Sequence, residues 1–411
     1  MVDTIAISGD EIASCVLDTF RKLPAKRKPL QRPDGSREWV PLSGVVLAKD
    51  GQPPFCASLG TGMKCLPASK VPHAQGIVLH DCHAEIIATR AFNQFLIQEC
   101  AILAQDGRAS SSWVRRTTIG EREINCQQPF ALEDDVVIFF YSSEAPCGDA
   151  SMELTMLAQE DATPWERGPE STKPGLVSTD NELKGRGFFS ELGIVRRKPA
   201  RPDAPITISK SCTDKMAMYQ CTSVLISTTS LLISPKGAYI TTLVLPKSQH
   251  VLTATDRAFG RTGRMSAISP EITQNWNDTF SFRPFNIITT TLEFEWSRRG
   301  GEAGCAMLPS NLTAVYTPHL QETLIGGVLQ GRKQHDPRGA SAICRKRMWA
   351  AVRDVHAIML DVSLTSKASE AARYKDLKTL PGLESRRRVK EDVRNVALRG
   401  WIRNDGDDLF S

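Results

Sequence analysis

Apolar residues recur along the chain with two different spacings, and each spacing predicts its own kind of element. The segments Ser8–Leu23 and Cys82–Cys100 carry apolar residues three and four positions apart, the pattern of a helix with one buried face. Ser8 and Glu11 match a capping box at the start of the first segment. Val136–Tyr141 is instead an unbroken apolar run of strand length, which indicates a strand buried on both faces.

Further expected strands and helices alternate along the chain. The expected strands are Trp39–Ala48, Phe55–Leu59, Ala238–Leu245, Phe285–Trp296 and Leu312–Tyr316, and the expected helices are Met152–Leu157, Ala342–Leu360, Ser366–Leu380 and Leu383–Arg399. No internal repeat and no clear linker interrupts this alternation, so one large α/β domain over residues 1–411 is favoured over separable modules. We expect residues 1–41 to form an N-terminal helix and a basic turn region, and the polar stretches near 105–133 and 158–184 to be loop insertions.

The composition is that of an ordinary globular protein. Hydrophobic residues make up 41% and charged residues 24%, which excludes fibrous and wholly disordered classes. No apolar run approaches the roughly 18 residues of a membrane-spanning helix, and the first residues lack the apolar core of a signal peptide. The eleven cysteines, an odd number, then favour reduced thiols. We therefore expect an intracellular protein, cytoplasmic or nuclear, with no membrane partner.

Positive charge is concentrated at the C-terminal end. The whole chain has a formal net charge of +5, but residues 331–411 contain 18 basic and 11 acidic residues. One interpretation is that these charges lie on solvated helix faces. The other is a polyanionic partner, either an RNA backbone or a polyphosphate held by lysine and arginine.

Two short motifs place potential metal ligands at the starts of helices. His83-Ala84-Glu85 opens the predicted helix after Cys82, and Pro146-Cys147-Gly148 follows the predicted buried strand. A thiol at a helix N-terminus ionises more easily, and zinc binds the thiolate. Glu85 would then lie beside a metal shared by His83 and Cys147 without ligating it. This arrangement matches half of the signature of zinc-dependent nucleobase deaminases.

The usual end of that signature is missing, because no cysteine follows Cys147 by three residues. A catalytic zinc needs three protein ligands and an open position for water, so a third ligand must come from another segment, and Cys212 is the candidate. A single cysteine or histidine is more often structural than a ligand, but the co-occurrence and order of the two motifs favour a metal site. A closed structural zinc site would need a fourth ligand. Cys82 is the nearby candidate, and we expect its side chain to point away from His83.

Three blocks of the sequence resemble the RNA adenosine-deaminase domain. That domain is shared by the adenosine deaminases acting on double-stranded RNA and the eukaryotic tRNA-specific deaminase that modifies adenosine 37. The blocks are HDCHAEIIATRAF, SEAPCGDASM and VRRKPARPDAPITISKSCTDK, with Thr213 where Ser is usual. A fourth stretch, GGVLQGRKQ, also resembles the family, with Gln330 where Asn is usual. The resemblance runs from about Leu42 to the C-terminus. It implies a cytidine-deaminase-like mixed sheet flanked by helices, enlarged by loop insertions and C-terminal helices.

The resemblance also implies the roles of the site residues. His83, Cys147 and Cys212 would ligate one catalytic Zn²⁺, which lowers the pKa of water to about 7. Glu85 would carry protons from the water to the purine ring and to the departing amino group. The implied reaction is the hydrolytic deamination of adenosine to inosine.

A second implied cofactor is inositol hexakisphosphate. Members of the family that this chain resembles bury this polyphosphate inside the catalytic domain. A polyphosphate would compensate lysines and arginines that cannot be buried unpaired. The resemblance assigns its contacts to Lys64, Arg90, Lys215, Ser230, Tyr374, Lys378 and Trp401, with Lys390 as a looser match. The chain departs from the family's usual Asn, Arg and Arg at His80, Thr89 and Met218, so part of the contact set differs. The run at 386–388, including Arg386, is expected to carry surface charges.

The expected substrate follows from how little sequence precedes the resemblance. About 40 residues precede it, too few for a double-stranded-RNA-binding domain, so we expect a tRNA substrate. The expected target is adenosine 37 in the anticodon loop of alanine tRNA, which is already single-stranded. We expect no DNA binding and no obligate protein partner. Two alternatives stay open: editing of other structured RNA with a partner that binds the duplex, and a catalytically silent RNA-binding subunit. The presence of Glu85 and all three ligands argues against the second.

Overall fold

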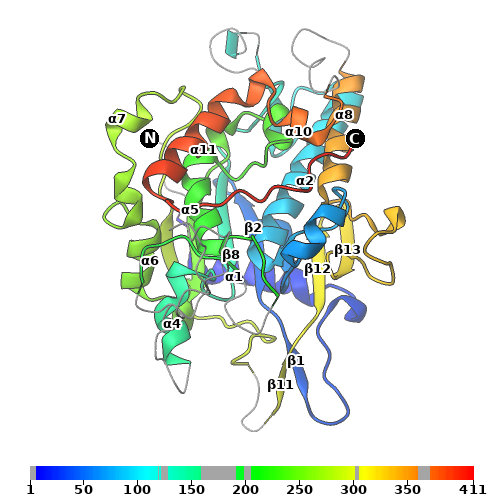
Figure 1. The fold of residues 1–411 in the computed structure, drawn as a ribbon, viewed down its shortest axis with the longest axis vertical. Helices are drawn as coiled ribbons and strands as arrows, with labels where there is room; N and C mark the ends of the chain where they lie inside the picture. The colour runs from blue at the N-terminus through cyan, green and yellow to red at the C-terminus, as the bar shows by residue number, and fades with distance from the viewer. Residues whose placement is uncertain are drawn as a thin grey trace, which may run out of the picture.

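The computed structural model describes residues 6–118, 120–121, 128–158, 191–198, 205–300, 305–359 and 371–411. Within these residues, a long mixed sheet crosses the molecule and helices cover both of its faces (Figure 1). No helix in these ranges is long and apolar enough to cross a membrane. The cysteines in the same ranges are all free thiols.

The central sheet has eight strands in the order β10-β9-β8-β2-β3-β12-β13-β14. Their bounds, in chain order, are β2 Leu42–Ala48, β3 Phe55–Thr61, β8 Val137–Ser142, β9 Ile240–Pro246, β10 Asn286–Thr290, β12 Leu312–Thr317, β13 Leu320–Ile325 and β14 Val328–Leu329. Strands β8, β9 and β10 are parallel, and the other neighbours are antiparallel. The predicted mixed α/β sheet is confirmed, and the unbroken apolar run forms the fully buried strand β8.

Strand β8 shows why the sheet needs a helical layer on each face. Phe140 lies in an apolar cluster with residues of α2 (Ala84–Asp106), whereas Phe139 lies in a second cluster with residues of α1 (Gly9–Arg21). Successive side chains of a strand point to opposite faces, so a continuous apolar run requires both faces to be covered. The capping box predicted at the start of α1 is present and fixes where that helix begins.

The other elements surround this core. The remaining helices are α4 Met152–Leu157, α5 Cys212–Thr222, α6 Leu252–Phe259, α7 Pro270–Thr273, α8 Arg345–Ile358, α10 Tyr374–Leu377 and α11 Glu384–Val396. Short strand pairs join β1 (Arg37–Trp39) to β11 (Met307–Pro309), β4 (Met63–Cys65) to β5 (Asp81–His83) and β6 (Val114–Arg116) to β7 (Phe130–Leu132). Short 3₁₀ helices lie at Ala25–Arg27, Ala68–His73, Asp149–Ser151, Thr229–Leu231, Pro235–Gly237, Lys247–Gln249, Arg264–Ala267, Pro337–Gly339 and Pro381–Leu383.

Some predicted boundaries differ from the structure. The strand predicted over Phe285–Trp296 ends at Thr290, because the Asp10 carboxylate accepts hydrogen bonds from Thr290 Oγ1 at 2.6 Å and from the Thr291 amide at 2.7 Å. The stretch near 105–133 is not loop alone, since β6 and β7 pair within it. The predicted insertion near 158–184 lies almost wholly outside the described residues, as does the first part of the helix predicted over Ser366–Leu380.

Candidate metal centre and buried cation cluster

Three separate elements bring one histidine and two cysteines together. His83 ends β5 and caps the start of α2, Cys147 lies in the loop that follows β8, and Cys212 is the first residue of α5. Their potential ligand atoms all lie within 4.8 Å of one another. His83 Nδ1 and Cys147 Sγ are 3.6 Å apart. One imidazole nitrogen and two thiol sulfurs form the donor set that zinc prefers.

The turn around Cys147 depends on a close approach between two loops. Gly148 has φ +113°, and a Cβ atom at this position would lie 2.3 Å from Ser211 Oγ. Glycine therefore allows the Cys147 loop to reach the start of α5. Thr213 ties the same two segments together, since its Oγ1 donates to the carbonyl of Pro146 at 2.8 Å.

The surroundings of Cys147 favour its thiolate form. A hydrogen bond with Cys212, together with the positive charges of Lys198 and His83, holds the pKa of the Cys147 thiol well below its usual range. The backbone N–H of Cys212 also donates to Cys147 Sγ at 3.4 Å. Zinc binds cysteine as the thiolate, so the residues present fit this metal.

Glu85 lies in the first turn of α2, two residues after His83. Its side chain is buried, with 5% of the residue exposed. Burial, followed by the negative charge of Cys147, raises the pKa of the Glu85 carboxyl group. A carboxyl group with a raised pKa holds and releases a proton more readily near neutral pH than an ordinary glutamate does. Beside a zinc site, this is the property that a proton carrier needs.

A buried lysine–aspartate pair supports the centre and was missed at the sequence level. Lys198 Nζ lies 3.0 Å from Cys212 Sγ and 2.9 Å from Asp81 Oδ2, and Asp81 accepts from the backbone N–H of His83 at 3.0 Å. Burial opposes ionisation of Asp81, but Lys198 and Lys215 hold the pKa of its carboxyl group well below its usual range. Asp81 was visible beside His83 in the sequence, yet its lysine partner is 117 residues away.

A second group of potential ligands shares His83. The ligand atoms of Cys65, Asp81 and His83 also lie within 4.8 Å of one another, but Asp81 already accepts from Lys198 and from the His83 backbone. Cys82 lies in an apolar cluster with Ile87 and neighbouring residues. Among the described residues, the group with two cysteines contains no fourth histidine, cysteine or carboxylate. This set therefore offers three candidate ligands for a metal ion.

Several elements contribute lysines and arginines to one cluster, which we call the cation cluster. Its members come from α2, α5, α8 and α11 and from the segments beside them (Figure 1). They are Arg90, Lys210, Lys215, Arg345, Lys378, Arg386, Lys390 and Arg394.

Like charges oppose one another throughout the cation cluster. Burial, with the charges of Lys215 and Arg394, lowers the pKa of Lys210 to about 7. Burial also holds the pKa of Lys390 well below its usual range, and Arg386 and Arg394 add to the effect. Buried positive charge is unfavourable unless an anion compensates it.

The C-terminal tail supplies acidic groups to one side of the cation cluster. Asp407 is 2.7 Å from His80 Nε2 and 3.2 Å from Arg345, and Asp408 is 3.2 Å from Lys378. No ion pair joins Arg386 or Lys390 to any residue that the structure describes. The tail therefore neutralises part of the cluster, and its Asp405 together with Glu391 offsets the charge of Arg394, whereas Arg386 and Lys390 have no ion-pair partner among the described residues.

Most residues predicted to contact a polyphosphate lie at the cation cluster. Arg90, Lys215 and Lys378 belong to it. The ring of Tyr374 is 5.1 Å from Lys378 Nζ, and that of Trp401 is 5.4 Å from Lys210 Nζ. The remaining two predicted contacts, Ser230 and Lys64, have other surroundings.

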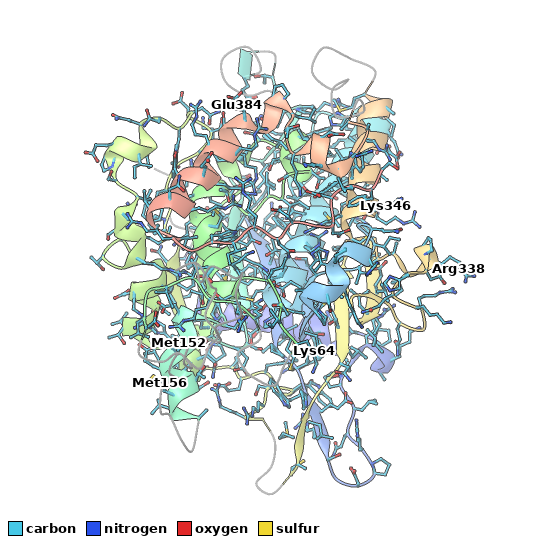
Figure 2. All side chains as sticks on the ribbon, viewed as in Figure 1. Lys64, Met152, Met156, Arg338, Lys346 and Glu384 are labelled. Carbon is cyan, nitrogen blue, oxygen red and sulfur yellow. The ribbon has the colours of Figure 1, made fainter. Side chains whose placement is uncertain are left out.

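Ser230 is buried in a 3₁₀ helix, where its Oγ donates to the carbonyl of Ile226 at 2.9 Å. Lys64 is not brought to the cation cluster. It is exposed on β4, opposite Cys82 in the strand register, and Figure 2 shows it in the lower half of the molecule.

The expectation that Arg386 is a surface charge was wrong. The residue is 4% exposed, and its guanidinium donates to the carbonyls of Thr222 and Leu225. Arg386 lies three and seven positions before Val389 and Val393, the buried apolar residues of α11, and therefore shares their face of the helix.

His80, Thr89 and Met218, the three positions that depart from the family's usual residues, each contact other parts of the protein. His80 binds Asp407, and Thr89 Oγ1 donates to the carbonyl of Glu85 at 2.8 Å. Met218 lies in the main apolar cluster. These side chains therefore add no positive charge to the cation cluster.

Comparisons with known proteins agree on one kind of domain. Residues 58–405 match the sequence model described as "Adenosine-deaminase (editase) domain". The "tRNA-specific adenosine deaminase 1" of Schizosaccharomyces pombe is 37% identical over 98% of this chain and 96% of that protein. The protein of the same name from Saccharomyces cerevisiae is 35% identical over 53% of each chain. The "Double-stranded RNA-specific editase Adar" of Drosophila melanogaster is 28% identical over 59% of this chain and 34% of its own length.

Proposed function

The chain belongs to the adenosine-deaminase (editase) domain family, and from that premise we propose that it converts adenosine 37 of alanine tRNA to inosine in a zinc-dependent hydrolysis. The observation that carries the proposal is the convergence of His83, Cys147 and Cys212 beside the buried carboxyl group of Glu85. An open three-ligand site with an adjacent proton carrier is what hydrolytic deamination requires.

The proposed metal ligands are the imidazole of His83 and the thiolates of Cys147 and Cys212. Zinc held by three protein ligands lowers the pKa of water to about 7, which makes hydrolysis possible at neutral pH. Lys198 stabilises the negative charge of the Cys212 sulfur through its 3.0 Å contact. Asp81 holds Lys198 in place and fixes the backbone of His83.

Glu85 is the proposed proton carrier. Its carboxylate takes a proton from the attacking water, whose oxygen forms a bond to C6 of adenine, and gives this proton to N1 of the ring. The carboxylate next takes the remaining proton from the new hydroxyl group at C6 and delivers it to the amino group, so that the C6 carbonyl of inosine forms, the C–N bond breaks and ammonia leaves. One carboxyl group can serve in both directions because its raised pKa allows it to alternate between charged and neutral forms.

We also propose that the cation cluster binds inositol hexakisphosphate. The uncompensated charges of Arg386 and Lys390 support a polyanionic ligand, and the proximity of Tyr374 and Trp401 supports the predicted contact set. Lys64 is left out of this set because it is exposed on β4. The ligand is structural, since its contacts join α2, α5 and α11 across the interior.

The extent of similarity favours tRNA over double-stranded RNA as the substrate. The S. pombe protein, named as tRNA-specific, is similar along nearly the whole of this chain, at 37% identity. The Drosophila double-stranded-RNA editase is 28% identical over a shorter part. An anticodon loop is single-stranded, so little energy is needed to turn the target base out of a stack.

The proposal is tested by incubating the purified chain alone with alanine tRNA transcripts that carry adenosine or guanosine at position 37. Inosine is read as a change of sequence after reverse transcription. Inosine should form at position 37 of the first transcript and nowhere in the second. Inosine at other positions, or activity confined to long duplex RNA, would assign the chain a different substrate.

A further inference from the structure

A projecting arm lies at the end of the molecule that carries β1 and β11 (Figure 1). We define this rim arm as residues 30–39, β11 and the turn at 296–300. Residues 30–38 form a hairpin, in which Gln31 pairs with Arg37 and the Arg32 amide donates to the Ser36 carbonyl at 2.8 Å. On its other edge β1 pairs with β11 in parallel, so the rim arm is a braced ribbon rather than a loose loop.

The base of the rim arm is joined to the candidate metal centre. The chain leaves β1 and reaches Pro41, whose carbonyl accepts from the amide of Gly62 at 3.2 Å. The carbonyl of Gly62 in turn accepts from the amide of Ala84 at 2.9 Å, and Ala84 directly follows His83. Two hydrogen bonds therefore connect the rim arm to a proposed metal ligand.

The other side of the base adjoins the segment before Cys147. Leu42 exchanges hydrogen bonds of 2.8 and 2.9 Å with Ser143. The next residue, Glu144, forms an ion pair with Arg299 of the rim arm at 3.1 Å. Glu144 is also close enough to Glu85 for the two negative charges to repel each other. The arginine-bearing turn thus lies at the rim of the site.

Two tryptophan rings hold two arginines of the rim arm, Arg37 and Arg298, in position. The guanidinium of Arg37 lies 4.5 Å from the centre of the Trp296 ring and donates to the carbonyls of Glu295 and Gly300. These contacts fix both ends of the turn. Arg298 lies within the turn, over the Trp39 ring at 6.0 Å.

Two exposed arginines of the rim arm are available to an external anion. Arg298 is exposed and forms no ion pair with any residue in the described ranges. Arg32, at the hairpin turn, has 46% of its side chain exposed, although it lies 3.2 Å from Glu38. An extended chain covers about 17 Å between Pro41 and Ser36. Arg32 and Arg298 therefore lie at different distances from the candidate metal centre.

We propose that the rim arm binds the phosphate backbone of the substrate RNA on the nucleotides that flank the target adenosine. This inference rests on the proposed function, since it assumes that a nucleobase is inserted beside Glu85. An inserted nucleotide brings its own 5′ and 3′ phosphates to the rim, where Arg298 and Arg299 lie. Arginine pairs with phosphate through charge-assisted hydrogen bonds, and such contacts position the RNA without reading its sequence.

The test compares Arg298→Ala and Arg32→Ala with Arg108→Ala as a matched control. Arg108 is exposed, with 58% of its side chain accessible, and forms an ion pair with Asp106 at 2.7 Å. It lies beyond the C-terminal end of α2, and the 23 residues of this helix place it roughly 34 Å from His83. Binding of a fluorescent alanine tRNA stem-loop is measured by anisotropy as salt is raised from about 50 to about 200 mM. Charge reversal, Arg298→Glu, strengthens the comparison.

Each rim-arm variant should bind the stem-loop about three- to tenfold more weakly at low salt. The slope of log K against log salt should fall by about 0.7–0.9 for each phosphate that the variant no longer neutralises, while Arg108→Ala keeps both values. Variants whose affinity and slope equal those of the control would overturn the proposal, and would leave a protein partner as the occupant of this surface.

The binding measurement separates this inference from the proposed function. If the unaltered chain binds the stem-loop through the rim arm but makes no inosine, the proposed reaction fails while the RNA-binding arm stands. If the chain makes inosine and the rim-arm variants bind like the control, the arm fails and the reaction stands. Thermal unfolding of each variant confirms that the exposed substitutions leave the fold intact.

Discussion

Lys390 provides a sharp test of the cation cluster, because a bound polyphosphate reverses the sign of the expected effect. Without an anion, Lys390 is a cation beside Arg386 and Arg394, and its pKa is held far below the usual range. Lys390→Met would then remove an unfavourable charge and leave the protein as stable as the unaltered chain or more stable. With a polyphosphate bound, the same change removes one partner of a buried ion pair and should cost about 3–5 kcal/mol.

The expected change in melting temperature follows from the size of the chain. An unfolding entropy of about 2.1 cal/mol/K per residue gives about 0.9 kcal/mol/K for 411 residues. A loss of about 3–5 kcal/mol therefore lowers the melting temperature by roughly 3–6 °C. Calorimetry of the protein as isolated measures this shift. Lys346→Met on α8, an exposed position labelled in Figure 2, is the control and should change stability by less than about 0.5 kcal/mol.

The same preparations also reveal the ligand. Denaturing the protein should release inositol phosphate, which is assayed directly. If Lys390→Met melts at the same temperature as the unaltered chain or higher, and no inositol phosphate is released, the buried cofactor is refuted. The basic C-terminal segment would then belong to the tRNA-binding surface.

Four further predictions test the same centres. Glu85→Ala should retain zinc and RNA binding but lose deamination by about 10²–10⁴-fold, and activity within about tenfold of the unaltered chain would remove Glu85 from the reaction. Cys212→Ala should lose zinc and activity together in metal analysis; full zinc occupancy would show that another residue is the ligand. Lys378→Glu should lower stability and yield through the cation cluster, whereas normal folding with weaker tRNA binding would place Lys378 on the RNA surface. In preparations without polyphosphate, the free energy of unfolding should rise between about pH 7 and pH 10.5, because Lys210 keeps its proton in the unfolded chain and releases it in the folded one. Thermal melts whose midpoint stays constant over this pH range would contradict this expectation.

The local parts of the site could be predicted from the sequence because each depends on a few adjacent residues. His83 stands at the start of α2 as predicted, and a helix start has a recognisable sequence. Cys147 was also expected at a helix start, but it lies in the loop that precedes the 3₁₀ helix Asp149–Ser151. The capping box at Ser8 and the buried strand β8 were predicted for the same reason. Boundaries set by distant contacts were not: β10 ends at Thr290 because Asp10, far away in sequence, bonds to it.

The electrostatic support of the site was hidden because it joins distant segments. Lys198 meets Asp81 across 117 residues, and no spacing rule connects them. Arg386 seemed to be one charge in a basic run, but it shares a helix face with Val389 and Val393 and is buried with them. Lys64 matched a family position in the sequence, whereas its alternation on β4 turns it outward. Burial of charge depends on packing, which a local pattern does not contain.

Zinc titration of metal-free protein is the most direct measurement of whether His83, Cys147 and Cys212 form the catalytic centre. Zinc is removed from the purified chain with a chelator and returned in steps, and inosine at position 37 of alanine tRNA is measured at each step. Inosine formation should rise in proportion to zinc and reach its maximum at one zinc per chain. Full activity in the metal-free chain, or a maximum that Cys147→Ala also reaches, would contradict the assignment of the reaction to this centre.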